Sequence, residues 1–216
     1  MKEELIKKAI SEIENPTFET TKQYLEVHSV ELENNKPRVE RIDFESFDNT
    51  NAVYFPVQDE LFFLVVYLNK SNGEINGVGT ENGHRVYLTA TSEHLTHNEL
   101  SELTKLQPLT GWSKNDLRKN GKSKHSFSRI SFEPTKNQAY ELEQKLKILL
   151  TELEKDKNGV KKLTEKAETY ISVCSNLYID GNKGIVFEKG IIKRMSELNL
   201  GIGIDQYVFG NELKDI

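Results

Sequence analysis

Residues 77–116 read GVGTENGHRVYLTATSEHLTHNELSELTKLQPLTGWSKND and carry the clearest fold signals of a chain that has 216 residues. Glycines crowd residues 77–83, and an alternating apolar pattern typical of a strand follows at residues 85–90. A dinucleotide-binding glycine motif follows a strand and opens a helix. Because a strand comes after this glycine-rich segment, we predict a turn or bulge at residues 77–83 and no phosphate-binding loop.

A short helix is predicted after that strand. Thr96 and Glu99 have the spacing of a capping box, in which each side chain satisfies a backbone N–H group near the helix start. Leu100 and Leu103 lie on one face of the helix, and Pro108 ends it.

Helices and strands alternate in the second half of the chain. Strands are predicted at residues 127–132, 168–179 and 200–209, a second capping-box-like sequence lies at residues 135–138, and a last helix covers residues 191–198. Such an order allows parallel or split-βαβ pairing as well as antiparallel pairing. We therefore predict a ferredoxin-like, split-βαβ module with helices packed on a sheet. A long helix is indicated by leucines at helical spacing, namely Leu142, Leu146, Leu149, Leu150 and Leu153.

Closely spaced strands are predicted in the first half. Residues 3–13 place their apolar side chains on one helical face. Alternation with a bulge at residues 28–29 predicts a strand over residues 23–32, and a second strand is predicted at residues 38–47. The most apolar run, residues 61–68, indicates a central strand buried on both faces. We expect an antiparallel-rich N-terminal sheet with one N-terminal helix, and the α+β class for the whole chain.

Composition restricts the class of protein. Hydrophobic residues make up 36% and charged residues 29%, which is too apolar for a disordered chain. The net charge of -5 argues against nucleic acid and anionic membrane as partners of the whole surface. The N-terminus lacks the features of a signal peptide, so a cytoplasmic location is expected. A single cysteine, Cys174, permits no disulfide within one chain and is predicted to be buried.

The segment PLTGWSKND, residues 108–116, resembles a motif of the bacterial DUF4279 family, Pro-Thr-x-x-Trp-x-Lys-Gly-Asp. Leu109 and Asn115 stand where the motif has Thr and Gly. The resemblance covers roughly residues 85–210 and implies no activity. It divides the chain into an N-terminal α+β extension, residues 1–84, and a DUF4279-like α+β module, residues 85–216, which pack closely or form one continuous unit. The matching positions are Pro108, Trp112, Lys114 and Asp116.

The loop from Trp112 to Arg129 is the candidate binding segment. Six basic residues fall in it and only Asp116 opposes them. An aromatic ring beside cations can stack on a planar ligand while the cations hold an anion. In the alternative interpretation, Trp112 is a core residue at one end of the sheet and Lys114 forms a local ion pair with Asp116. The candidate binding residues are Trp112, Lys114, Asp116, Arg118, Lys124 and His125.

No catalytic or metal-binding pattern is predicted. His94 and His97 are the one close histidine pair, but Thr96 as the helix cap leaves His94 outside the helix, and no third ligand is indicated. A nucleophile-elbow motif is absent from the sequence. We therefore expect no cofactor and no metal.

Three functional interpretations stay open. The first is a non-enzymatic binding protein of the bacterial cytoplasm with a protein partner, for instance an immunity protein that covers a basic toxin, by analogy of class alone. The second is a small-ligand or anion site in the loop of residues 112–129, in a binding protein or an enzyme. The third is a purely structural role for the Trp112 motif. No membrane or nucleic-acid partner is expected, and the oligomeric state is left open.

Overall fold

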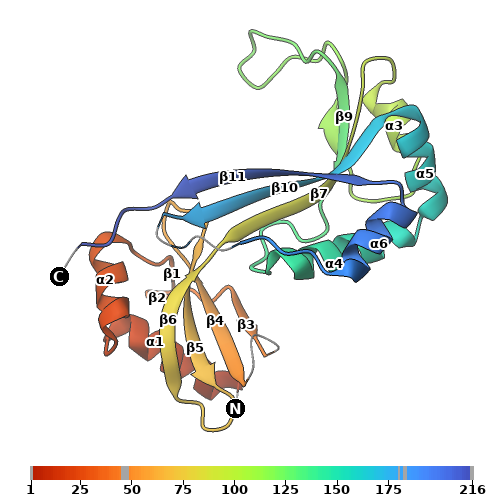
Figure 1. Ribbon diagram of the computed structural model, residues 1–216. Helices are drawn as coiled ribbons and strands as arrows, with labels where there is room; N and C mark the ends of the chain where they lie inside the picture. The colour runs from red at the N-terminus through yellow and green to blue at the C-terminus, as the bar shows by residue number, and fades with distance from the viewer. Residues whose placement is uncertain (1, 45–48, 180, 182–183, 215–216) are drawn as a thin grey trace. The chain divides into compact units, whose positions relative to one another are not determined.

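The structure is a computed structural model that describes residues 2–44, 49–179, 181 and 184–214 (Figure 1). The chain forms two compact units. Unit 1 comprises Met1–Gly83, Ser175–Gly184 and Gln206–Ile216, and unit 2 comprises His84–Cys174 and Ile185–Asp205. The chain therefore enters each unit more than once.

Unit 1 contains a four-stranded antiparallel sheet. Its order is β3 (Arg41–Asp43), β4 (Thr50–Pro56), β5 (Phe63–Asn69) and β6 (Ile75–Glu81). The interior position of β5 and its buried residues on both faces confirm the prediction of a central strand at residues 61–68. Residues 45–47 of the second predicted strand lie outside the described residues.

Two helices, and not the single one expected, pack in unit 1. They are α1 (Lys2–Glu14) and α2 (Glu19–Val27), and the strand predicted over residues 23–32 is wrong because α2 occupies its first half. The alternation of Leu25 and Val27 misled the prediction over a window too short to separate the two periods. The remainder forms a small hairpin of β1 (Leu32–Glu33) and β2 (Lys36–Pro37).

A buried carboxylate fixes the turn between these two helices. Glu12 accepts hydrogen bonds from the backbone N–H groups of Thr17 and Phe18 and from the hydroxyls of Thr17 and Thr21. These donors include backbone N–H groups next to the start of α2, where no intrahelical acceptor exists. The side chain of Glu12 thus takes the place of an N-terminal capping residue for α2.

The glycine-rich segment lies in strands, so the predicted turn at residues 77–83 is wrong, whereas a register shift typical of the predicted bulge lies at its start. Gly77 and Gly79 lie within β6, which pairs with β5, and the register shifts between the pair Tyr67–Gly77 and the pair Leu68–Ile75. Gly83 begins the next strand, and a Cβ atom on it would lie 1.7 Å from the carbonyl oxygen of Leu61. Glycine is needed at that position because two backbones approach each other closely.

Unit 2 is built on a five-stranded sheet with the order β11-β10-β7-β9-β8. The strands β10-β7-β9-β8 have the order of a ferredoxin-like sheet, with β7–β9 and β8–β9 antiparallel, which agrees with the predicted split-βαβ module. β11 extends this sheet beside β10, and their arrowheads point the same way in Figure 1. The bounds are β7 (Gly83–Ser92), β8 (Thr110–Trp112), β9 (Ser128–Phe132), β10 (Glu168–Tyr178) and β11 (Gly201–Phe209).

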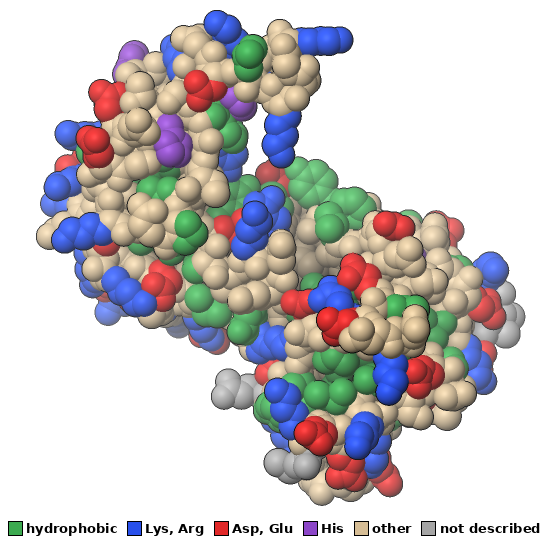
Figure 2. Space-filling model, turned by 180° about the vertical axis from the view of Figure 1, so that it is seen from behind, with side chains coloured by type: hydrophobic (Ala, Val, Ile, Leu, Met, Phe, Trp, Pro, Cys, Tyr) green, Lys and Arg blue, Asp and Glu red, His purple; other side chains and the backbone are tan. Residues whose placement is uncertain are grey.

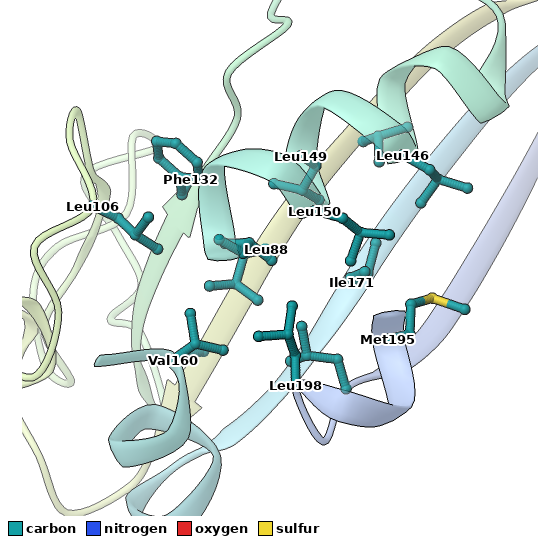
Figure 3. Packing of buried hydrophobic residues seen from close by; sticks show 14 of the residues in the cluster. Leu88, Leu106, Phe132, Leu146, Leu149, Leu150, Val160, Ile171, Met195 and Leu198 are labelled. Atoms are coloured by element: carbon teal, nitrogen blue, oxygen red, sulfur yellow. The ribbon is translucent and has the colours of Figure 1, made fainter. Parts of the chain in front are cut away.

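Four helices supply side chains to the core of unit 2. They are α3 (His97–Glu102), α4 (Leu142–Glu154), α5 (Lys157–Lys166) and α6 (Lys189–Glu197). In Figure 3, Leu150 of α4 and Val160 of α5 lie over Leu88 and Ile171 of the sheet. All five leucines predicted for the long helix are buried. The apolar face of α4 therefore covers one face of the sheet.

The two predicted capping boxes have different outcomes. Thr96 and Glu99 form one at the start of α3, as predicted. The second, at residues 135–138, is wrong because α4 begins only at Leu142 after Glu141. Among the described residues, no helix is long and apolar enough to cross a membrane.

Candidate functional site

One face of the sheet in unit 2 carries no helix of that unit. Along β9, Ile130 and Phe132 point into the core, so Arg129 and Ser131 point the other way. Trp112 in β8 pairs directly with Arg129 and therefore lies on the same face. This surface, which also carries Tyr87, Thr89 and Ser172, is called the helix-free face.

Arg129 is the central residue of the helix-free face. Its Nε donates to the hydroxyl of Ser131 at 3.0 Å, and one Nη donates to the hydroxyl of Thr89 at 3.2 Å. Its guanidinium carbon lies 5.5 Å from the ring centre of Tyr87 and 5.4 Å from that of Trp112. Across the part of the chain that the structure describes, no carboxylate pairs with Arg129. Arg129 is thus a partly buried cation without a counter-ion.

The neighbouring arginine on this face is already neutralised. Arg85 donates to both carboxylate oxygens of Glu133, at 3.1 and 2.7 Å, and these hydrogen bonds raise its pKa. Its guanidinium also lies over the ring of Tyr87. Arg85 therefore braces Tyr87 and offers less charge to a ligand than Arg129 does.

Cys174 also reaches the helix-free face, so the prediction that it is buried is wrong. Its side chain is partly exposed, and its sulfur lies 3.6 Å from the hydroxyl of Tyr87. Burial raises the pKa of Tyr87, and the hydrogen bond with Cys174 adds to that shift. Alternation along β10 turns Val173 into the core and Cys174 away from it.

Trp112 is held at the edge of the face by three contacts. Its indole Nε1 donates to the carbonyl of Phe127 at 3.0 Å. The ring of His125 stacks on it with centroids 4.2 Å apart, and the guanidinium of Arg129 lies over it. The indole is partly exposed and does not belong to the buried cluster of unit 2.

Residues 113–126 form a hairpin-like projection, which we call the basic arm. The backbone pairs Leu117 with Lys124, and Arg118 donates its N–H to the carbonyl of Ser123. The side chain of Asn120 closes the tip by accepting from the N–H groups of residues 122 and 123. Lys and Arg side chains project from the arm in the space-filling view (Figure 2).

The six predicted binding residues do not gather at one point. Trp112 and His125 lie together beside Arg129. Lys114 reaches back to the carbonyl and the carboxylate of Glu93, and no ion pair joins it to Asp116. Asp116 accepts from the N–H of Ser113, which shapes the base of the arm. Arg118 and Lys124 are exposed on the arm.

Sequence reasoning missed the residues at the centre of the face. Arg129 is one of the six basic residues of the loop but not one of the predicted binding residues, and neither Tyr87 nor Thr89 is predicted to bind a ligand. The sequence does contain a signal for this face. Arg85, Tyr87 and Thr89 alternate with apolar residues along one strand, which indicates a polar face opposite the core.

The helix-free face also carries two hydroxyl groups that contact each other. The hydroxyls of Thr89 and Ser172 lie 3.0 Å apart, and neither contacts a His or a carboxylate in the described parts of the chain. A serine or threonine nucleophile needs such a base. The described residues contain no group of three potential metal ligands.

Comparison with known proteins identifies the family alone. The sequence model of one family, described as "Domain of unknown function (DUF4279)", matches residues 81–209 and leaves the N-terminal region outside the match. No curated protein and no solved structure matches the chain. The match covers more than half of the sequence and confirms the resemblance seen at residues 108–116, so the chain belongs to the DUF4279 family.

Proposed function

We propose that this protein is a non-enzymatic binding protein, and that the helix-free face of unit 2 holds a carboxylate or phosphate group of its ligand. The observation that carries the proposal is Arg129, a partly buried arginine without a counter-ion in the described residues. A charge in such a place is costly unless it is paired. An anionic ligand would supply the missing pair.

The guanidinium of Arg129 retains free donors for this purpose. Two of its nitrogens are engaged by Ser131 and Thr89, which fix the plane of the group. The second Nη has no hydrogen-bond partner among the described residues. A planar fork held in place suits the paired oxygens of a carboxylate or phosphate.

The rings of the face support an anion site better than a base-stacking site. His125 already stacks on Trp112, and Tyr87 is only 9% exposed beneath two arginines. A nucleic-acid platform needs open aromatic faces on which successive bases stack. The ligand is therefore recognised by its charge and not by a stacked base.

The basic arm favours the same sign of charge in the ligand. Arg118 and Lys124 have no ion-pair partner in the part of the chain that the structure covers. Their positive charge attracts an anion toward Arg129 within the Debye screening length, which is about 10 Å at an ionic strength of 0.1 M. A basic partner protein, as in the immunity-protein example, would be repelled by this face.

The test uses the single tryptophan as a reporter. Trp112 lies beside Arg129, so an anion that binds there should change its fluorescence. Titration with inorganic phosphate, citrate and a short capped oligoglutamate peptide covers both kinds of anion. We expect at least one of them to give a saturable change, and no response to any of them would overturn the proposal.

Two substitutions distinguish a specific anion site at Arg129 from general attraction by the positive charge of the surface. Arg129→Gln should weaken the affinity for the anion that gives the fluorescence change by about 10- to 100-fold. This is the contribution of one or two hydrogen bonds to a charged group. Arg118→Gln removes the same charge from the arm and should cost less than about twofold. Equal losses in the two variants would show that no site exists at Arg129.

A further inference from the structure

The first 83 residues are far more acidic than the rest of the chain. They contain 16 Asp and Glu against 8 Lys and Arg, a net charge of -8, whereas residues 84–216 contain 18 against 21, a net charge of +3. Such an asymmetry indicates separate electrostatic roles for the two parts. The anion site proposed above uses none of the residues of the acidic part.

A groove in unit 1 concentrates part of this negative charge. Its volume is about 800 Å³, within the range of ligand sites, and it is lined by α1, α2, the β1–β2 hairpin and residues 58–59. Three carboxylates line it, and none of its lining residues is Lys or Arg. These carboxylates belong to Glu14, Glu31 and Asp59.

Two of the three carboxylates lack a partner. Glu31 is bound by Arg38, with 2.9 Å between the guanidinium and the carboxylate. Glu14 and Asp59 are exposed and make no ion pair or side-chain hydrogen bond with any described residue. They are therefore free to pair with cations from outside.

Apolar side chains line the same groove as the carboxylates. Ile13, Leu25, Val30 and Pro37 line the groove, and Leu32 stands at it with 63% of its surface exposed. An exposed leucine beside other apolar residues can gain free energy by burial against a partner. His28 also lines the groove, and its Nε2 accepts the N–H of Asn211 at 3.3 Å.

We propose that this groove binds a basic, partly apolar segment of a partner protein in an extended form. Charge complementarity requires a positively charged partner segment, since Glu14 and Asp59 would pair with Lys or Arg side chains. Leu32 is 63% exposed at the groove, so an apolar side chain of the partner can reach it. The apolar residues of the lining give affinity to apolar residues of the segment that accompany the basic ones.

The test is binding of a defined peptide to the full chain. The probe is a fluorescein-labelled peptide of about eight residues in which Lys and Val alternate, with capped ends. Two further peptides replace Lys by Glu or Val by Gly. Fluorescence anisotropy should show the Lys–Val peptide binding at least about tenfold more tightly than either, and more weakly at high salt.

Matched variants locate the binding. The double variant Glu14→Gln, Asp59→Asn should lower the affinity for the Lys–Val peptide at least about fivefold. Leu32→Ser should lower it at least about threefold. Asn is chosen because residue 59 has a φ of 60°, which Asn tolerates. The control, Glu4→Gln with Glu74→Gln, changes the charge equally at exposed positions outside the groove and should cost less than about twofold.

Three results would overturn the proposal. The first is equal weakening by the control pair, which would indicate attraction by the general charge. The second is binding of the Glu–Val peptide as tight as that of the Lys–Val peptide. The third is self-association in sedimentation that the Glu14→Gln, Asp59→Asn pair abolishes, because the occupant would then be a second copy. None of these outcomes depends on Arg129, so this proposal and the anion site fail separately.

Discussion

At the scale of single residues, Trp112 joins the family motif to the candidate site. Three contacts hold its ring, from Phe127, His125 and Arg129, but part of its surface is exposed. Full burial of a tryptophan is worth about 3–5 kcal/mol on truncation to Ala. We expect Trp112→Ala to lower the free energy of unfolding by about 1–3 kcal/mol, measured by urea denaturation followed by circular dichroism. A negligible loss would mean that the contacts do not hold the loop.

Glu12 makes the stability of unit 1 depend on pH. Burial alone would raise its pKa, but hydrogen bonds from Thr17, Thr21 and Phe18 outweigh burial and hold the pKa below its ordinary value of 4.5. A depressed pKa stabilises the folded state above that ordinary value, and the contribution is lost as the pH falls through the folded-state pKa.

Glu12→Gln tests this dependence. The variant should be less stable than the wild type by about 1–3 kcal/mol at neutral pH. The difference should shrink as the pH falls through the lowered pKa of Glu12, because the wild-type carboxylate then becomes protonated. Urea denaturation at several pH values measures it, and a difference that is constant with pH would contradict the assignment.

The central residue of the site could not be selected from sequence. Arg129 is one of six basic residues in the loop, and nothing local distinguishes it. Its position depends on the pairing of Trp112 with Arg129 across two strands separated by 15 residues. By contrast, Trp112 and His125 are predicted as binding residues because an aromatic and a titratable residue in a run of basic residues can be recognised without the pairing.

At the scale of elements, long periodic segments were predicted well and short ones poorly. The leucine spacing of α4 and the apolar run of β5 both extend over several residues, so their periods are unambiguous. The stretch around α2 offers only Leu25 and Val27 inside the helix, and the capping group Glu12 lies in another helix. A cap supplied from outside the helix leaves no local signature.

The glycines of residues 77–83 give a prediction within one segment. A Cβ atom on Gly77 would meet nothing within 4 Å, whereas one on Gly83 would collide with the backbone of Leu61. Gly77→Ala should change the free energy of unfolding by less than about 0.5 kcal/mol. Gly83→Ala should lower it by more than about 3 kcal/mol or prevent folding. Thermal unfolding of the two variants compares them, and similar midpoints would contradict the close approach.

At the scale of the whole molecule, the division at residues 84 and 85 stays a prediction that expression can test. Tyr178 belongs to the core cluster of unit 1 and is only 1% exposed. Its ring packs against Phe62 and Tyr24, and its hydroxyl donates to the carbonyl of Asn211. A fragment of residues 1–84 keeps Phe62 and Tyr24 but lacks Tyr178 and Asn211.

We expect this fragment to be destabilised by at least about 3 kcal/mol, the cost of removing one large buried aromatic residue. That loss is a large share of the 5–15 kcal/mol that usually holds a domain together. Near-ultraviolet circular dichroism and urea denaturation of the fragment measure it. A fragment with a cooperative transition and native-like aromatic signals would show that residues 1–84 fold independently of the C-terminal segments.

The central claim is that Arg129 forms the core of an anion site, and Trp112 fluorescence tests it most directly. The account predicts a saturable change on titration with phosphate, citrate or oligoglutamate. Arg129→Gln should weaken it about 10- to 100-fold, Arg129→Lys should weaken it less because the charge remains, and Arg118→Gln should leave it almost unchanged. No response to any of the three anions, or an equal loss in the Arg129 and Arg118 variants, would contradict the claim.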